Sequence, residues 1–100
     1  MEMNLQYFRP LVGTCFAVAG ANPPVEIRLE EASDRSGPSI EGRRHECFSL
    51  LFRCPSEPAL PQGTFTLQQP GEQDITLFLV PIATIDINSR RYEAVFNQYV

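Results

Sequence analysis

The stretch Val25-Glu-Ile-Arg-Leu-Glu30 alternates apolar and charged residues at every position. This period of two is typical of a β-strand that buries one face and exposes the other to water. We therefore expect a strand here, and the same reasoning extends outward along the chain. Glycine, proline and short polar runs delimit further predicted strands over residues 14–19, 46–53, 63–68, 75–87 and 90–98.

The amino-terminal segment instead has helical spacing. Apolar residues recur three or four apart between Leu5 and Val12, Asn4 suits an N-cap, and Pro10 limits the helix to about one turn. One helical turn and six short strands predict an all-β fold, a small six-stranded antiparallel barrel or sandwich with a short N-terminal helical turn. The whole chain, residues 1–100, is expected to form one β domain.

Two predictions concern the connections between strands. Residues 33–44 are almost entirely polar, so they are expected to form a mobile loop and a place for variable contacts. Asn88-Ser89 suits a two-residue hairpin loop, which fixes the register of the last two strands. On one face this register pairs Ile85 with Tyr92, Ala83 with Ala94 and Pro81 with Phe96, and on the other face it pairs Asp86 with Arg91 and Ile82 with Val95.

Composition excludes several classes of function. Twelve acidic and eight basic residues give a net charge of -4 without a basic stripe, so nucleic acid is not an expected partner. The apolar runs are shorter than the roughly 20 residues that cross a bilayer, which predicts no membrane span. The amino terminus lacks a basic start followed by an apolar stretch, so a cytoplasmic location is expected.

Candidate chemistry centres on one histidine and three cysteines. Cys47 and Cys54 are expected on opposite faces of one strand, too far apart for a disulfide, and Cys15 leaves an odd thiol, so all three are predicted to be free. His45 and Cys47 would point the same way and suggest a metal site or a nucleophile with its base. No second His-Cys cluster completes such a site, the carboxylates have no acid–base spacing, and the glycines are scattered. We therefore expect neither an enzyme nor a bound cofactor or metal.

Two arginine pairs are the candidate partner-binding residues. Arg43 and Arg44, like Arg90 and Arg91, fall at predicted loop ends, and together they would attract an acidic partner if the fold brings those ends to one side. Another protein is the expected partner, and the sequence leaves the oligomeric state open. The alternative is a barrel that holds a small apolar ligand among inward-facing rings, namely Phe16, Phe48, Phe52, Phe65 and Phe78.

Several phrases of the sequence carry a family resemblance. They are Phe8-Arg-Pro-Leu-Val-Gly-Thr-Cys-Phe16, Phe48-Ser-Leu-Leu-Phe-Arg-Cys-Pro55, Leu60-Pro-Gln-Gly-Thr-Phe65, Leu77-Phe-Leu-Val-Pro-Ile82 and Tyr92-Glu-Ala-Val-Phe-Asn97. In this order they resemble a family of small bacterial proteins that is described only as a domain of unknown function. That resemblance implies that the protein is encoded near tail-fibre or tail-collar type proteins of phages and phage-like particles. Such a neighbourhood implies a structural or assembly partner. It carries over no catalytic residues.

Overall fold

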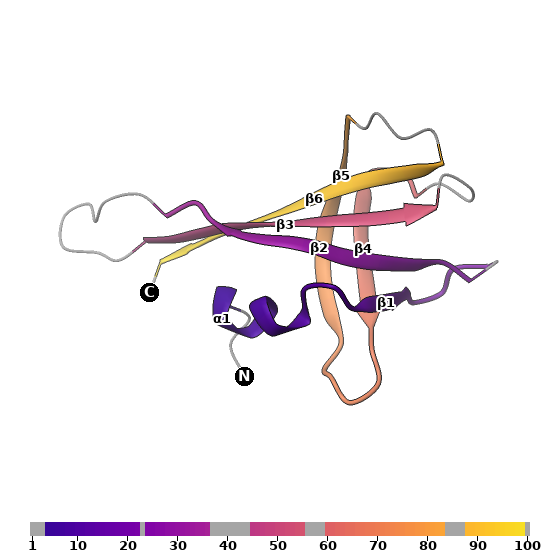
Figure 1. Cartoon of the computed structure of the whole chain (residues 1–100), viewed down its shortest axis with the longest axis horizontal. Helices are drawn as coiled ribbons and strands as arrows, with labels where there is room; N and C mark the ends of the chain where they lie inside the picture. Colours follow the sequence, from indigo (N-terminus) through magenta and orange to yellow (C-terminus); the bar gives the residue numbers. More distant parts are fainter. Residues whose placement is uncertain (1–3, 23, 37–44, 56–59, 84–87, 100) are drawn as a thin grey trace.

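The computed structural model of the chain describes residues 4–22, 24–36, 45–55, 60–83 and 88–99. Six strands pair antiparallel in the order β1-β2-β3-β6-β5-β4, and β4 pairs with β1 to close a barrel (Figure 1). Their bounds are β1 Cys15–Val18, β2 Glu26–Asp34, β3 His45–Pro55, β4 Gly63–Gln68, β5 Ile75–Ile82 and β6 Ser89–Tyr99. The all-β prediction is confirmed, and closure of the sheet decides between the predicted barrel and the predicted sandwich.

The strands lie in two crossing directions. Figure 1 shows β2, β3 and β6 running side by side along the molecule, while β4 and β5 run across them. This crossing follows from the strong twist and tilt that a barrel of few strands requires. Gly20, in the turn between β1 and β2, and Gly71, between β4 and β5, have φ angles of 76° and 82°, which glycine adopts without strain.

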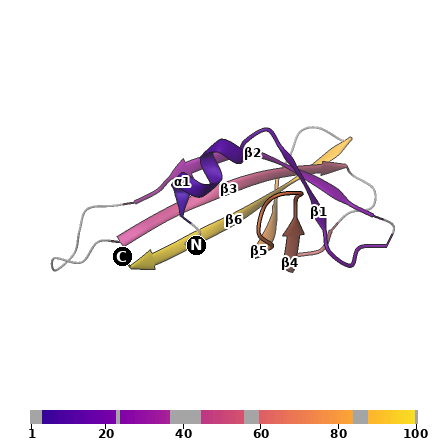
Figure 2. The same ribbon diagram turned by 90° about the horizontal axis from the view of Figure 1, so that it is seen from below.

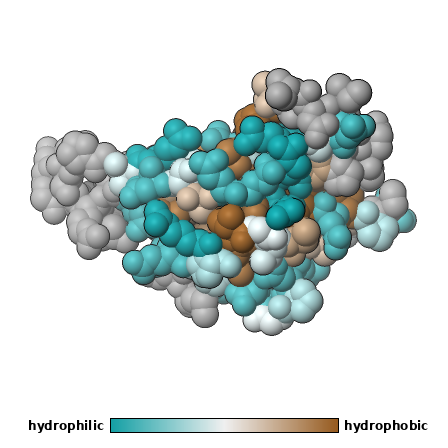
Figure 3. Space-filling view, viewed as in Figure 1, coloured by the Kyte–Doolittle hydropathy of each residue, from teal (hydrophilic) through white to brown (hydrophobic). Residues whose placement is uncertain are grey.

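The core consists of the inward-facing residues of every strand. Alternate positions are buried in β5 and in the first half of β2, and in β3 Phe48, Leu50, Phe52 and Cys54 are buried together with Ser49. The largest fully buried side chains are Tyr92, Phe8, Phe16, Phe48, Phe52, Ile27, Leu29, Leu50, Leu67, Ile75 and Leu79. The face drawn in Figure 3 is mostly hydrophilic, with hydrophobic residues visible in small areas.

Helix α1 (Leu5–Phe8) and the 3-10 turn η1 (Arg9–Leu11) close one end of the barrel. The side chain of Asn4 accepts a hydrogen bond from the Tyr7 N–H at 2.9 Å, which confirms the predicted N-cap. Phe8 then packs against Phe48 and Phe96, with ring centroids 5.9 and 5.5 Å away. The predicted helical turn is therefore a plug that fills the open end of the interior.

Strand β2 continues further than its sequence suggested. Ser33 and Asp34, predicted to begin the mobile loop, belong to β2 and pair with Ser49 and Phe48 of β3. A polar composition does not prevent pairing, because ladder hydrogen bonds use the backbone and the outer face of a sheet tolerates polar side chains. The start of the predicted 33–44 loop is thus corrected, and residues 37–44 lie outside the described residues.

The hairpin between β5 and β6 exists, but the predicted register is wrong. Pro81 lies opposite Tyr92 rather than Phe96, and Ile82 lies opposite Arg91 rather than Val95. The displacement is an even number of residues, so Pro81 and Ile82 stay on the faces that the prediction gave them. Ile85 and Asp86 lie outside the described residues. Among the described residues, β5 pairs with β6 only over Val80–Ile82, and its residues Ile75–Leu79 pair with β4. The prediction considered β5 and β6 alone and did not include the pairing with β4.

One aromatic residue was assigned to the wrong side of the barrel. Phe16, Phe48 and Phe52 are buried as predicted, and Phe65 packs partly against the core. Phe78 is 49% exposed, because the inward positions of β5 are Ile75, Leu77 and Leu79. In the described part of the chain, no helix is long and apolar enough to span a bilayer.

Candidate functional site

Three arginines form a row across the outer face of the barrel. Arg28 of β2 lies directly opposite Arg53 of β3, and Arg53 lies directly opposite Arg91 of β6. Each alternates with core residues of its own strand, so all three side chains point away from the interior. We call Arg28, Arg53 and Arg91 the arginine row.

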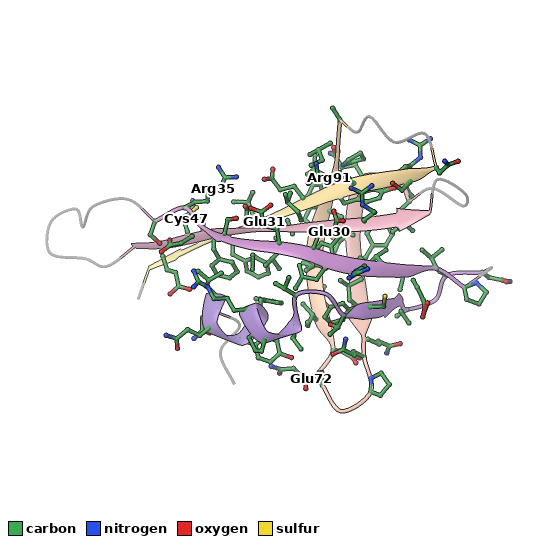
Figure 4. The ribbon with its side chains drawn as sticks, in the orientation of Figure 1. Glu30, Glu31, Arg35, Cys47, Glu72 and Arg91 are labelled. Atoms are coloured by element: carbon green, nitrogen blue, oxygen red, sulfur yellow. The ribbon has the colours of Figure 1, made fainter. Side chains whose placement is uncertain are left out.

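A β-bulge supplies one carboxylate to this row. The register shifts between Leu29 and Glu31, so Glu30 is the extra residue of β2. Glu30 Oε2 accepts from Arg53 Nε at 2.8 Å, and Glu30 Oε1 lies 3.6 Å from Arg91 Nε. Figure 4 shows Glu30 and Arg91 close together on this side of the barrel. The buried Arg91 Nε has no hydrogen-bond partner among the described residues. Glu30 therefore forms a hydrogen-bonded ion pair with Arg53 and only a longer ion pair with Arg91.

A surface pocket of about 370 Å³ lies at the Arg28 end of the row. Here β2 and β3 separate, because their pairing ends at Arg28 and Arg53 while β2 continues to Glu26. Arg53 Nη1 donates to Ser89 Oγ at 2.5 Å, which holds the Arg53 guanidinium at the pocket edge. The lining residues are Cys15, Glu26, Arg28, Arg53, Cys54, Asn88 and Ser89.

Of the four predicted partner-binding arginines, the structure describes Arg90 and Arg91. Arg91 joins the arginine row, and Arg90 is exposed beside it and pairs with Cys54 near the end of β3. Arg43 and Arg44 lie outside the described residues, so their predicted role with an acidic partner stays a prediction. Arg28 and Arg53 were not predicted as site residues, because only the strand order β2-β3-β6 brings them beside Arg91.

The cysteines and the histidine do not assemble a described reactive centre. Cys47 and Cys54 lie seven residues apart on β3, Cys54 with the buried residues and Cys47 on the other face, and all three cysteines are free as predicted. Burial raises the pKa of the Cys54 thiol. His45 begins β3, and its side chain lies outside the described residues. Among the residues that the structure describes, no cluster of three His, Cys, Asp or Glu side chains could hold a metal ion.

Strand β6 has an open edge beyond the arginine row. It pairs with β3 from Ser89 to Tyr99, but the described pairing with β5 ends where Val80 lies opposite Glu93. From Ala94 onward, no described strand lies on the second side of β6, and Figure 2 shows this part at the margin of the sheet. An edge without a neighbouring strand can pair with a strand of another chain.

Exposed apolar side chains gather where β5 leaves β6. Phe78 and Val80 of β5 are 49% and 37% exposed, and Val95 of β6 is 60% exposed. Continuing the register that pairs Val80 with Glu93 would bring Phe78 level with Val95, so the two side chains mark opposite sides of the opening. We call the open edge at Ala94–Tyr99 together with Phe78 and Val95 the β6 fork.

The fold and these two surfaces define a small closed antiparallel β-barrel with an open strand edge and an arginine-rich face. The chain belongs to the family Domain of unknown function (DUF6916), whose model matches residues 3–96. The predicted membership of a family of unknown function is thereby confirmed. No curated protein and no solved structure matches the chain.

Proposed function

We propose that this chain is a non-catalytic protein-interaction domain whose partner adds a β-strand at the β6 fork. The single observation that supports the proposal most is the character of the open edge. Ala-Val-Phe-Asn-Gln-Tyr, from Ala94 to Tyr99, contains no charged residue and no proline. Natural sheets usually protect an exposed edge with lysine, proline, a bulge or a short strand. An unprotected edge of this length favours docking of another strand.

The side chains around the fork favour the same mode of binding. A strand added to β6 would hydrogen-bond through its backbone and cover Val95 on the outer face. Phe78 would meet the added strand from β5, so two exposed apolar side chains would be removed from water. The partner proposed from the family resemblance is a structural protein of a phage-tail-like particle, for which this barrel would be an assembly accessory.

The alternative of an apolar ligand inside the barrel has less support. Phe16 and Phe52 are buried with ring centroids 6.3 Å apart in an edge contact, and Phe48 stacks on Phe96 at 4.8 Å. Rings packed against one another in the core occupy space that such a ligand would need. We therefore place the binding function on the outside of the barrel.

The test is capture of partners by the tagged chain from its source cells, followed by hydrogen exchange on the purified complex. Val95→Lys should abolish recovery of the partner, because a lysine on an edge strand opposes addition of another strand. Gln68→Lys on β4 carries the same charge change at an exposed site away from the fork and should retain the partner. Val95 is 60% exposed, so folding should be unaffected.

Hydrogen exchange identifies the edge directly. Amides of Ala94–Tyr99 that do not pair with β3 should exchange more slowly in the complex than in the free chain. A partner that binds the Val95→Lys variant equally well and leaves these amides unprotected would refute strand addition at the fork. Recovery of an enzyme substrate or a small apolar ligand in place of a protein would refute the proposed class of function.

A further inference from the structure

The arginine row is unusual for the outer face of a sheet. Arg28, Arg53 and Arg91 stand directly opposite one another on three neighbouring strands, and like charges in that position repel. The chain as a whole has a net charge of -4, so this local excess of positive charge is not a general property of its surface.

Among the described residues, Arg28 has no ion-pair partner. Glu30 is engaged by Arg53 and Arg91. Arg28 forms no hydrogen bond or ion pair with the part of the chain that the structure describes, although Glu26 lines the same pocket. Among the described residues of the arginine row and the pocket, three guanidinium groups therefore meet two carboxylates, Glu26 and Glu30. The described part of the site carries one positive charge more than negative charges.

The chemistry of the lining selects the kind of anion. A guanidinium presents parallel N–H donors that match a carboxylate or phosphate with two hydrogen bonds. Glu26 in the lining would repel a doubly charged phosphate more strongly than a singly charged carboxylate. Cys15 and Cys54 add weakly polar surface for a short aliphatic stem, and Asn88 and Ser89 add polar groups at the rim.

We propose that the pocket between β2 and β3 binds a carboxylate group, with Arg28 as its principal ligand. The site is separate from the β6 fork and does not depend on strand addition there. The carboxylate has two sources with the same chemistry, a small free acid or an acidic side chain of a bound protein. In either case the bound group supplies the negative charge that the arginine row lacks.

The test is an NMR titration of the full chain at constant ionic strength. The probes are propionate, a capped Ala-Glu-Ala peptide and inorganic phosphate, and the signals are backbone amides and arginine Nε–Hε groups. We expect saturable shifts at Arg28 with millimolar affinity for a carboxylate, since so small a ligand makes few contacts. Tighter binding of propionate than of the peptide identifies a free acid, and the reverse order identifies a protein side chain.

Variants separate recognition by Arg28 from general attraction of anions. Arg28→Gln should weaken carboxylate binding at least tenfold. Arg28→Lys should weaken it less, because lysine keeps the charge but cannot form the two parallel hydrogen bonds of a guanidinium. Arg9→Gln makes the same charge change at an exposed arginine on η1 and should leave binding unchanged. Equal loss in Arg28→Gln and Arg9→Gln, absence of saturable shifts, or tighter binding of phosphate would overturn the proposal.

A second measurement on the unmodified chain covers the case in which the Arg28 variants fail to fold. Cys15 is exposed and lines the pocket, so it can report on occupancy. The thiolate of Cys15 displaces iodide from iodoacetate, which carries a carboxylate, or from neutral iodoacetamide. Propionate should lower the rate of alkylation by iodoacetate relative to the rate by iodoacetamide at Cys15. The same ratio at Cys47 should not change. An equal effect of propionate at both thiols would contradict a carboxylate site.

Discussion

Removal of one buried hydroxyl should destabilise the barrel strongly. The Tyr92 hydroxyl donates to the Leu60 C=O at 2.8 Å and accepts from the Leu60 N–H at 2.9 Å. Tyr92 is fully buried and Leu60 is 9% exposed, so water cannot replace these bonds in a Tyr92→Phe variant. The single hydroxyl therefore attaches Leu60, which lies just before β4, to the start of β6.

The magnitude follows from the two bonds and the groups they leave behind. Each bond contributes about 0.5–1.5 kcal/mol, and a buried N–H or C=O without a partner costs about 1–3 kcal/mol. Because these contributions overlap, we expect Tyr92→Phe to lower the free energy of unfolding by about 2–4 kcal/mol. For a chain of this size, that loss corresponds to a fall in Tm of roughly 10–20 °C.

Urea denaturation followed by circular dichroism measures the effect. Tyr7→Phe is the matched control, because the Tyr7 hydroxyl donates to Glu72 Oε1 at 3.0 Å on the exposed surface. That control should change stability by less than about 0.5 kcal/mol. If the two variants lose the same small amount, the Leu60 backbone is satisfied by another group and the reasoning is refuted.

Two further predictions concern the thiols and the bulge. Because burial raises the pKa of the Cys54 thiol, N-ethylmaleimide should modify Cys15 before Cys54, and folding stability should fall as pH rises above the ordinary thiol value of 9.0. Mass spectrometry and urea titration check these outcomes, and simultaneous labelling would contradict the first. Glu30→Gln should cost up to about 1 kcal/mol at low salt and less at high salt, because its half-exposed ion pairs are partly screened, whereas Glu31→Gln should change little. Equal urea midpoints for the two variants at low salt would count against the role assigned to Glu30.

Local sequence patterns were sufficient where a single strand or cap decides the outcome. The period of two places Ile27 and Leu29 in the core, and β4 has the predicted bounds Gly63–Gln68. Asn4 caps α1 because its side chain needs only the Tyr7 N–H three residues later. In each case the deciding interaction lies within a few residues or within one face of a strand.

Local sequence patterns did not predict features that depend on the pairing of three or more strands. The predicted pairing of Pro81 with Phe96 considered β5 and β6 alone, whereas in the structure Pro81 lies opposite Tyr92 and most of β5 pairs with β4. The outward position of Phe78 was missed for a related reason, since both faces of β5 carry apolar residues and only pairing chooses between them. The arginine row was missed because no local pattern brings Arg28 beside Arg53.

The bulge at Glu30 connects the fold to the proposed carboxylate site, and the sequence contains a signal for it. Glu30 and Glu31 are consecutive acids at the end of a strict alternation, and a regular strand would turn Glu31 into the core. The extra residue lets both carboxylates face outward while Ala32 returns to the core side opposite Leu50. Bulges are enriched beside functional sites because they redirect a side chain. Here the bulge places Glu30 between Arg53 and Arg91, so the repulsion at that end of the row is compensated internally. Arg28, at the other end, forms no ion pair with the described residues and lines the pocket, which is where we place a ligand's carboxylate.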